Sequence, residues 1–249
     1  MVARLNRPDK KNATSEEMLL ALREALEAAN DDDAIRCFVI TGTGDAFCSG
    51  GDLGRRAKEG GDPTPLERKN RLLGTHRVAL TVEQFEKPLI AAVNGPAVGA
   101  GMDLALMCDI RFAAASARFS EGYIRVGLIP GNGGCYFLPR IVGVARALEL
   151  LMTGEFVGAD EALRIGLVNQ VYDDDKFLDS AYTYAKKIAA MPPVAVSMIK
   201  RTVYQSLTCD LRTSLELIAS QMTIVQTTQD YREAIAAYKG KRAGVFKGK

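Results

Sequence analysis

The sequence predicts an α/β fold, and three observations support this prediction. Residues 35–41 and 89–93 are short apolar runs with β-branched residues, as is typical of buried parallel strands. Each run precedes a glycine-rich turn, at residues 46–53 and 94–101. From residue 144 onward the chain is helical by pattern. We therefore expect parallel strands joined by right-handed βαβ connections, followed by a mostly helical final portion.

Helices are predicted from periodicity and from the signals at their ends. Residues 15–30 place apolar side chains on one face, and Thr14 with Glu17 is predicted to form the capping box of this helix. A second helix is expected at about residues 65–85, after a connection rich in Gly and Pro. The later helices are expected at residues 144–152, 159–165, 175–190, 194–206, 211–226 and 230–238.

Composition favours one large soluble domain. A chain of 249 residues with 47% hydrophobic residues is long enough to bury a substantial core. The net charge is only +2 and no basic run is present, so nucleic acid is not an expected partner. No segment approaches the roughly 20 apolar residues of a membrane span, so no membrane association is expected. The five scattered cysteines argue against disulfides and a zinc site, and favour a cytoplasmic location.

The two glycine-rich turns, AFCSGGDL at residues 46–53 and NGPAVGAG at residues 94–101, are the strongest functional signal. Small residues let the main chain approach a ligand closely, and the helix start after such a turn adds a fixed positive dipole. Two backbone N–H groups brought together in this way form an oxyanion hole. The alternative is that both turns are only tight connections between a strand and a helix.

These turns and the segments after them resemble the crotonase family, the enoyl-CoA hydratase/isomerase superfamily. The second turn continues as MDLALMCDIR, which places Asp103 near the start of an apolar helix. Further matching segments follow in the expected order, at residues 119–123, 127–131, 138–140, 153–154, 159–162, 166–168 and 246–249. The resemblance therefore covers nearly the whole chain.

The resemblance implies a crotonase-type spiral of ββα units with a C-terminal helical region. Residues 1–190 are expected to form the spiral core with an acyl-CoA site, and residues 191–249 a helical trimerisation region. A homotrimer or a dimer of trimers is the expected assembly. A dinucleotide-binding fold is not expected, because neither turn has the complete G-x-G-x-x-G pattern with an acidic residue at the right distance.

The resemblance also assigns chemistry to individual positions. The backbone N–H groups of Gly51 and Ala100 are expected to hold the oxygen of a thioester enolate. Asp103 occupies the first acid position of the family and is expected to move the proton. Tyr123 occupies the second acid position. A phenol with a pKa near roughly 10 is a poor base at neutral pH, but it can donate or hold a hydrogen bond.

Two other residues offer alternatives for proton transfer. Glu121 lies two residues before Tyr123 and substitutes for the second acid if the backbone turns differently, and otherwise it is a salt-bridge or exposed residue. His76 is the only histidine and lies on a predicted helix where some crotonase relatives carry a catalytic histidine. A surface or packing role is its alternative. The third acid position of the family falls on Gly131, which carries no acid, and Asn132 beside it offers only an amide.

The resemblance implies coenzyme A as part of the substrate, with no separate cofactor and no metal. The adenine is expected near the first turn, and basic residues are expected to meet the phosphates. The candidate CoA-binding residues are Arg7, Lys11, Ala46, Ser49, Gly51, Asp52, Leu53 and Phe246, with Lys239 and Lys241 as further basic candidates. The tail residues among them are expected to act from a neighbouring subunit. Each basic residue is also consistent with a solvated surface charge.

The expected function is the processing of an acyl-CoA thioester through an enolate, by isomerisation or hydration of an enoyl-CoA. Isomerisation is favoured, because syn hydration benefits from two carboxylates and only Asp103 occupies an acid position. One alternative is hydrolysis, ring opening or decarboxylation of an acyl-CoA with Tyr123 or His76. Another is a non-catalytic protein that binds acyl-CoA.

Overall fold

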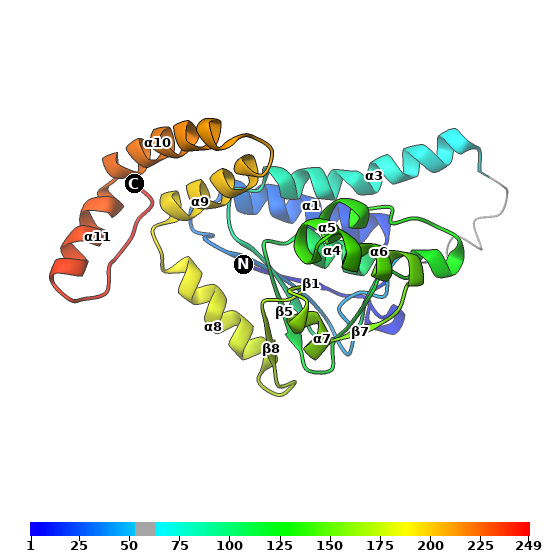
Figure 1. Cartoon of the computed structure of the whole chain (residues 1–249). Helices are drawn as coiled ribbons and strands as arrows, with labels where there is room; N and C mark the ends of the chain where they lie inside the picture. The colour runs from blue at the N-terminus through cyan, green and yellow to red at the C-terminus, as the bar shows by residue number, and fades with distance from the viewer. Residues whose placement is uncertain (53–62) are drawn as a thin grey trace.

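A computed structural model describes residues 1–52 and 63–249, and its strands form two sheets (Figure 1). The larger sheet is parallel, with the strand order β1-β2-β3-β5-β8. Its strands are β1 (Val2–Leu5), β2 (Phe38–Gly42), β3 (Leu89–Val93), β5 (Ile110–Ala114) and β8 (Gln170–Tyr172). The smaller sheet contains β4 (Ala97–Val98), β6 (Arg118–Ser120) and β7 (Val157–Gly158).

The two predicted strands lie side by side at the centre of the larger sheet. Every residue of β2 and of β3 is buried, and Phe38 is paired in register with Leu89. A parallel sheet that is covered on both faces requires such continuous apolar runs. β3 has the predicted bounds. β2 begins three residues later than predicted, because the N–H of Ile35 donates to the carbonyl of Asp32 in a turn.

The first two long helices, α1 (Glu16–Asp31) and α3 (Pro65–Gln84), pack against each other. The prediction that Thr14 and Glu17 form a capping box at the start of α1 is wrong. Ser15 is the N-cap, and its side chain accepts from the N–H of Met18. Thr14 instead pairs with the first glycine-rich turn, where its N–H donates to the carbonyl of Gly50 at 2.7 Å. This pairing holds Thr14 outside the helix.

The later helices agree with the predicted segments to within two residues at each end. They are α6 (Val144–Thr153), α7 (Ala159–Arg164), α8 (Phe177–Ala189), α9 (Pro193–Ser206), α10 (Leu211–Thr227) and α11 (Gln229–Lys239). Helix α8 packs on β2, β3, β5 and β8, whereas α10 and α11 project away from the sheets (Figure 1). Among the described helices, none is long and apolar enough to cross a bilayer.

Helix α9 is attached to the sheet by an ion pair. Lys200 on α9 lies 2.8 Å from the carboxylate of Asp109, and both side chains are less than a fifth exposed. Asp109 also accepts from the hydroxyl of Tyr204 at 2.9 Å and from the N–H of Leu89 at 2.8 Å. A buried charge is tolerated only when it is paired and hydrogen-bonded in this way. The start of the C-terminal helices is therefore joined to β3 and to the residue before β5.

Three short elements lie around the second glycine-rich turn. Helix α4 (Ala100–Met107) begins in this turn, and the 3₁₀ helix η2 (Gly122–Val126) follows β6. Helix α5 (Gly134–Val142) was not among the predicted helices. It begins with glycine and contains Pro139, both of which conceal a helical pattern in the sequence.

Candidate active site

The two glycine-rich turns lie against each other. The N–H groups of Phe47 and Cys48 donate to the carbonyl of Pro96 at 3.2 and 3.1 Å, and the N–H of Val98 donates to the carbonyl of Cys48 at 2.9 Å. A methyl group built on Gly101 would lie only 2.1 Å from that same carbonyl oxygen. Glycine is required there because only a residue without a Cβ permits this approach.

The N–H groups that were expected to hold an enolate come from these adjoining turns. A methyl group built on Gly50, the residue before Gly51, would lie 3.7 Å from the backbone nitrogen of Ala100. Ala100 is the first residue of α4, so its N–H has no partner within the helix. Gly50 has a φ of +99°, which favours glycine. The residue before Gly51 thus lies beside the backbone nitrogen of Ala100.

Asp103 lies in the first turn of α4 and is completely buried. Its Oδ2 accepts from the Tyr123 hydroxyl at 2.5 Å and from the N–H of Asn132 at 3.2 Å. Its Oδ1 makes no hydrogen bond of normal geometry to any described residue. One oxygen of the carboxylate is therefore held by hydrogen bonds, while the other is buried without a hydrogen-bond partner among the described residues.

Glu121 is the second buried acid of the site. Its side chain is 1% exposed, and neither carboxyl oxygen has a hydrogen-bond partner among residues 1–52 and 63–249. A methyl group built on Gly134 would lie 2.6 Å from Oδ1 of Asp103 and 2.8 Å from Oε1 of Glu121. The alternative interpretation of Glu121 as a salt-bridge or exposed residue is wrong. The backbone between β6 and η2 turns its side chain inward beside Asp103.

The environment separates the protonation of these two acids. Burial raises the pKa of Asp103 to about 6, although the hydrogen bonds from Tyr123 and Asn132 oppose the rise. Burial and, next, the charge of Asp103 raise the pKa of Glu121 to about 9. At neutral pH, Asp103 is therefore largely ionised, while Glu121 keeps its proton. A pair of acids with separated pKa values is typical of general acid–base catalysis.

Tyr123, on η2, acts as a hydrogen-bond donor to Asp103. Its ring lies 3.6 Å from a methyl group built on Gly99, so the phenol is packed against the second turn. Burial and the nearby carboxylate of Asp103 raise the pKa of the phenol, which keeps it protonated. This environment rules out Tyr123 as a base at neutral pH.

The whole chain, residues 1–249, matches the family model described as enoyl-CoA hydratase/isomerase. The chain belongs to this family. It is 37% identical to 1,2-epoxyphenylacetyl-CoA isomerase of Escherichia coli over 100% of the chain and 95% of that relative. It is 36% identical to crotonyl-CoA hydratase of Syntrophomonas wolfei over 97% of the chain and 92% of that relative. The crystal structure of an enoyl-CoA hydratase from Bacillus anthracis matches with a TM-score of 0.95. The two proteins are 35% identical, and the match covers 100% of this chain and 95% of that structure.

These likenesses confirm the expected crotonase fold and an enzyme of the enoyl-CoA hydratase/isomerase type. A non-catalytic acyl-CoA-binding protein is therefore not the best account of the chain. They do not decide between hydration and isomerisation, since relatives with either name match at almost the same identity.

His76 does not contact either acid of this hydratase/isomerase. Its Nε2 lies 2.7 Å from the carbonyl oxygen of Gly131, so the imidazole ties α3 to the loop before α5. The predicted packing role accounts for this contact. Among the described residues, no group of histidine, cysteine and acidic side chains is arranged to hold a metal ion.

The basic CoA candidates near the first turn differ in their contacts. Arg7 donates to the carbonyl of Ala13 at 2.6 Å and forms a 2.9 Å ion pair with Asp52. Lys11 is largely exposed and lies 3.9 Å from the exposed carboxylate of Asp45. Arg7 and Asp52 thus neutralise each other, whereas Lys11 is accessible to an anion.

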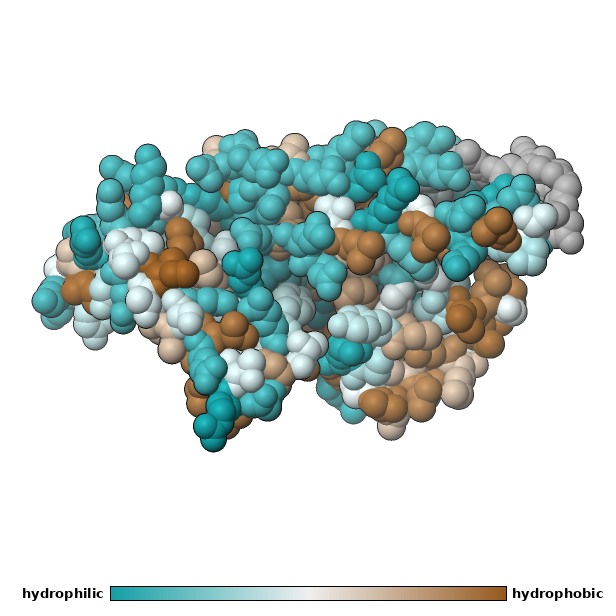
Figure 2. All heavy atoms as spheres, turned by 90° about the horizontal axis from the view of Figure 1, so that it is seen from above, coloured by the Kyte–Doolittle hydropathy of each residue, from teal (hydrophilic) through white to brown (hydrophobic). Residues whose placement is uncertain are grey.

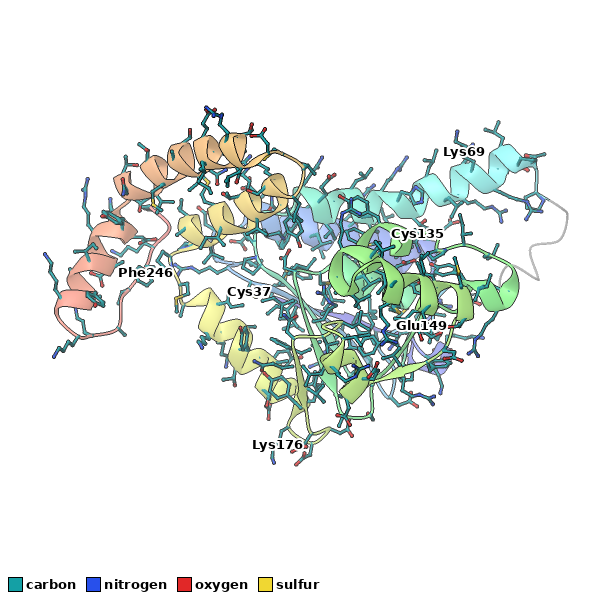
Figure 3. All side chains as sticks on the ribbon, viewed as in Figure 1. Cys37, Lys69, Cys135, Glu149, Lys176 and Phe246 are labelled. Carbon is teal, nitrogen blue, oxygen red and sulfur yellow. The ribbon has the colours of Figure 1, made fainter. Side chains whose placement is uncertain are left out.

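The other CoA candidates lie in different surroundings. The hydroxyl of Ser49 donates to the carbonyl of Lys10, and Ala46 is buried. Phe246 lies in the C-terminal segment, far from the start of α5 where Cys135 lies (Figure 3). Its carbonyl accepts from Arg36 at 2.7 Å. Leu53 lies outside the described residues.

The sequence did not reveal three features of the site. Gly134 provides the space between the two acids, and the N–H of Asn132 supports Asp103. Asn12 is fully buried and donates from Nδ2 to the carbonyls of Thr43 and Ala46, which fixes the first turn. The GNGG run at residues 131–134 is the only sequence signal for the first two features.

Proposed function

We propose that this enzyme hydrates the double bond of an enoyl-CoA thioester by acid–base catalysis with Asp103 and Glu121. The observation that carries the proposal is that the unpartnered oxygens Oδ1 of Asp103 and Oε1 of Glu121 lie close together, each within 3 Å of the position that a Cβ on Gly134 would occupy. A single acid at Asp103 would favour isomerisation. A second acid beside Asp103 supports the addition of water, which requires a base and an acid on one face of the substrate.

In the proposed reaction, the thioester oxygen binds the N–H groups of Gly51 and Ala100. Ionised Asp103 removes a proton from water, and the water oxygen forms a bond to the β-carbon. The electron pair of the double bond moves onto the thioester oxygen and gives an enolate. Loss of one such N–H donor costs about 3 kcal/mol of barrier in enzymes of comparable design.

The proton on Glu121 completes the proposed addition. The enolate collapses, and its α-carbon takes the proton from Glu121. Asp103 then holds the proton that came from water, and its transfer to Glu121 restores the starting state. The separated pKa values of about 6 and about 9 support this division of roles.

Isomerisation is the second candidate function. Asp103 alone, held by Tyr123, suffices to move a proton from the α-carbon to the γ-carbon of a 3-enoyl-CoA, without net consumption of water. Hydrolysis, ring opening and decarboxylation with Tyr123 or His76 receive less support. Tyr123 is engaged with Asp103, and His76 with the carbonyl of Gly131.

The proposed assembly is a homotrimer or a dimer of trimers formed through residues 191–249. Large exposed apolar side chains on α9 and α10 support it, namely Ile199, Val203, Leu207, Leu211, Leu215 and Met222. Hydrophobic residues also gather at the end of the molecule opposite the C-terminal helices (Figure 2).

Coenzyme A is proposed to enter only as part of the substrate, with Lys11 as a phosphate contact. The absence of disulfides among the five cysteines is consistent with the proposed cytoplasmic location.

The test is to mix the purified protein with crotonyl-CoA and follow the ultraviolet absorbance of the conjugated thioester. Loss of this absorbance with the original chain, and not with Asp103→Asn or Glu121→Gln, would establish hydration by the pair. If Glu121→Gln retains full activity, the pair mechanism is wrong. If crotonyl-CoA is unchanged while a 3-enoyl-CoA gains absorbance, isomerisation is the function. Asp175→Asn, an exposed acid on the surface, is the matched control.

A further inference from the structure

Asn132 connects helix α3 to the proton-transferring acid. Its backbone N–H donates to Oδ2 of Asp103 at 3.2 Å, and its Nδ2 lies 3.3 Å from the hydroxyl oxygen of Tyr123. On its other side, Oδ1 of Asn132 lies 2.8 Å from the hydroxyl oxygen of Thr75, on α3. A chain of polar groups therefore runs from Thr75 through Asn132 and Tyr123 to Asp103.

Only one direction of donation satisfies every link in this chain. Tyr123 uses its single proton in the short contact with Asp103, so its oxygen accepts from Nδ2 of Asn132. Oδ1 of Asn132 then requires a donor, which is the hydroxyl of Thr75. The carbonyl of Leu72 also lies 2.9 Å from this hydroxyl, but a carbonyl inside a helix already accepts from the N–H four residues later. All three donations thus point toward the carboxylate.

The chain of hydrogen bonds from Thr75 contacts only one of the two carboxylate oxygens of Asp103. Oδ2 receives the Tyr123 hydroxyl and the Asn132 N–H, whereas Oδ1 faces the space beside Glu121 and Gly134. We infer that Thr75 and Asn132 are positioning residues that hold Oδ2 of Asp103 and leave Oδ1 as the oxygen that accepts the proton. This inference rests on the proposed function only where it takes water as the source of the proton that Asp103 accepts.

A second consequence concerns the charge on Asp103. Hydrogen bonds that point in one direction strengthen one another and stabilise an ionised acceptor. The titratable groups that face Asp103 are Glu121 and Tyr123, with Cys135 on α5 also within electrostatic range. Of these, only Tyr123 opposes protonation of Asp103, and it belongs to the chain. Removal of one of these hydrogen bonds should therefore raise the pH at which Asp103 loses its proton.

The experiment measures that titration directly, in the absence of substrate. Infrared spectra of the full-length protein are recorded as a function of pH, and the spectrum of Asp103→Asn is subtracted to isolate the carboxyl signal of Asp103. Thr75→Val and Asn132→Ala are expected to raise the midpoint by roughly half to one pH unit. Asn132→Ala retains the backbone N–H, so the change reports on the side-chain amide. Thr75→Ser keeps the hydroxyl and should restore the original midpoint.

Turnover provides the second readout. Below about pH 6.5, both variants are expected to lose threefold to tenfold in kcat, while KM stays unchanged because neither residue lies in the glycine-rich turns. Thr223→Val, on the exposed face of α10, removes a hydroxyl that donates only to its own helix, and serves as the control.

The inference is wrong if folded Thr75→Val and Asn132→Ala proteins both titrate as the original chain does. Thermal unfolding monitored by circular dichroism identifies a variant that has not folded, and the remaining variant then decides. If the midpoints shift but the original chain converts no enoyl-CoA, the positioning role stands and the proposed function fails. The two failures are therefore distinguishable.

Discussion

Asp103 and Glu121, which lie eighteen positions apart in the sequence, both approach Gly134 so closely that a Cβ there would lie 2.6 Å from one carboxyl oxygen and 2.8 Å from the other. Neither acid has a cation beside it among the described residues, so neither acid belongs to a structural salt bridge. Buried polar atoms without partners are rare in folded proteins and call for an explanation. A site that binds substrate and moves protons provides one.

Replacement of Gly134 by alanine is expected to abolish turnover. The new methyl group would lie within 3 Å of both carboxyl groups and would force them apart. We expect kcat/KM to fall at least about 100-fold, since displacement of a catalytic group by 1 Å has effects of this size. Gly74→Ala is the control, because a methyl group on this exposed glycine of α3 meets no atom within 4 Å. It should leave turnover unchanged and increase stability by about 1 kcal/mol.

The dependence of hydration on pH should be bell-shaped. Activity requires ionised Asp103 and protonated Glu121, so kcat/KM should rise as the pH increases through about 6 and fall as it passes about 9. Glu121→Gln should lose the decline at high pH together with most of the activity. A profile that keeps this decline in Glu121→Gln would assign it to another group.

Asp103→Asn is expected to be inactive and yet more stable at high pH. The pKa of Asp103 is raised from 3.8 in the unfolded chain to about 6 in the folded protein, so its contribution to stability is present below about 4 and is lost as the pH rises through about 6. Asparagine removes this penalty. Thermal unfolding at about pH 8 should therefore give a higher Tm for the variant, with the difference vanishing near pH 4. An unchanged Tm at both pH values would contradict the raised pKa.

The attachment of α9 should depend on one ion pair. Removal of Lys200, as in Lys200→Ala, leaves Asp109 without its cation, and breaking a buried pair costs about 3 kcal/mol or more. Arg201→Ala, the next residue, breaks only the exposed 3.8 Å contact with Glu86 and should cost less than about 1 kcal/mol. Urea unfolding measures both, and limited proteolysis should cut the C-terminal helices of Lys200→Ala first. Equal losses in the two variants would reject this account.

His76→Gln should leave turnover almost unchanged. The glutamine amide can donate to the carbonyl of Gly131 as the imidazole does in the structure. His76→Leu removes the donor and should lower the thermal stability by a few degrees, because the carbonyl loses its partner. A loss of more than tenfold in kcat for His76→Gln, without loss of stability, would instead indicate a direct role in the reaction.

Much of the fold could be predicted because the relevant signals are local. The bounds of β3 and of the late helices follow from apolar runs, from periodicity and from glycine and proline stops. The start of α1 was misplaced by one residue because Thr14 pairs with Gly50, a contact between distant segments. Helix α5 was missed because it begins with Gly134, where a side chain would clash with both acids, and contains Pro139, and both residues are poor helix formers.

The candidate site was predicted only in part, for a geometric reason. Position in the family pattern identified Asp103 and Tyr123, and the structure brings them into hydrogen-bond contact. It could not reveal that the chain turns between β6 and η2, so that Glu121 lies beside Oδ1 of Asp103 while Tyr123 donates to Oδ2. Only the backbone path through this turn determines that both side chains reach the same carboxylate.

The mutual support of the two glycine-rich turns has a consequence for how such a protein can change over evolutionary time. The main-chain contacts that join them are made by Phe47, Cys48, Pro96 and Val98, and the closest approach depends on Gly101. Substitutions that preserve these glycines and the side chains of Asn12 and Asn94, which donate to the carbonyl of Ala46, leave the backbone frame intact. The other side chains around the two turns can therefore vary while the frame persists.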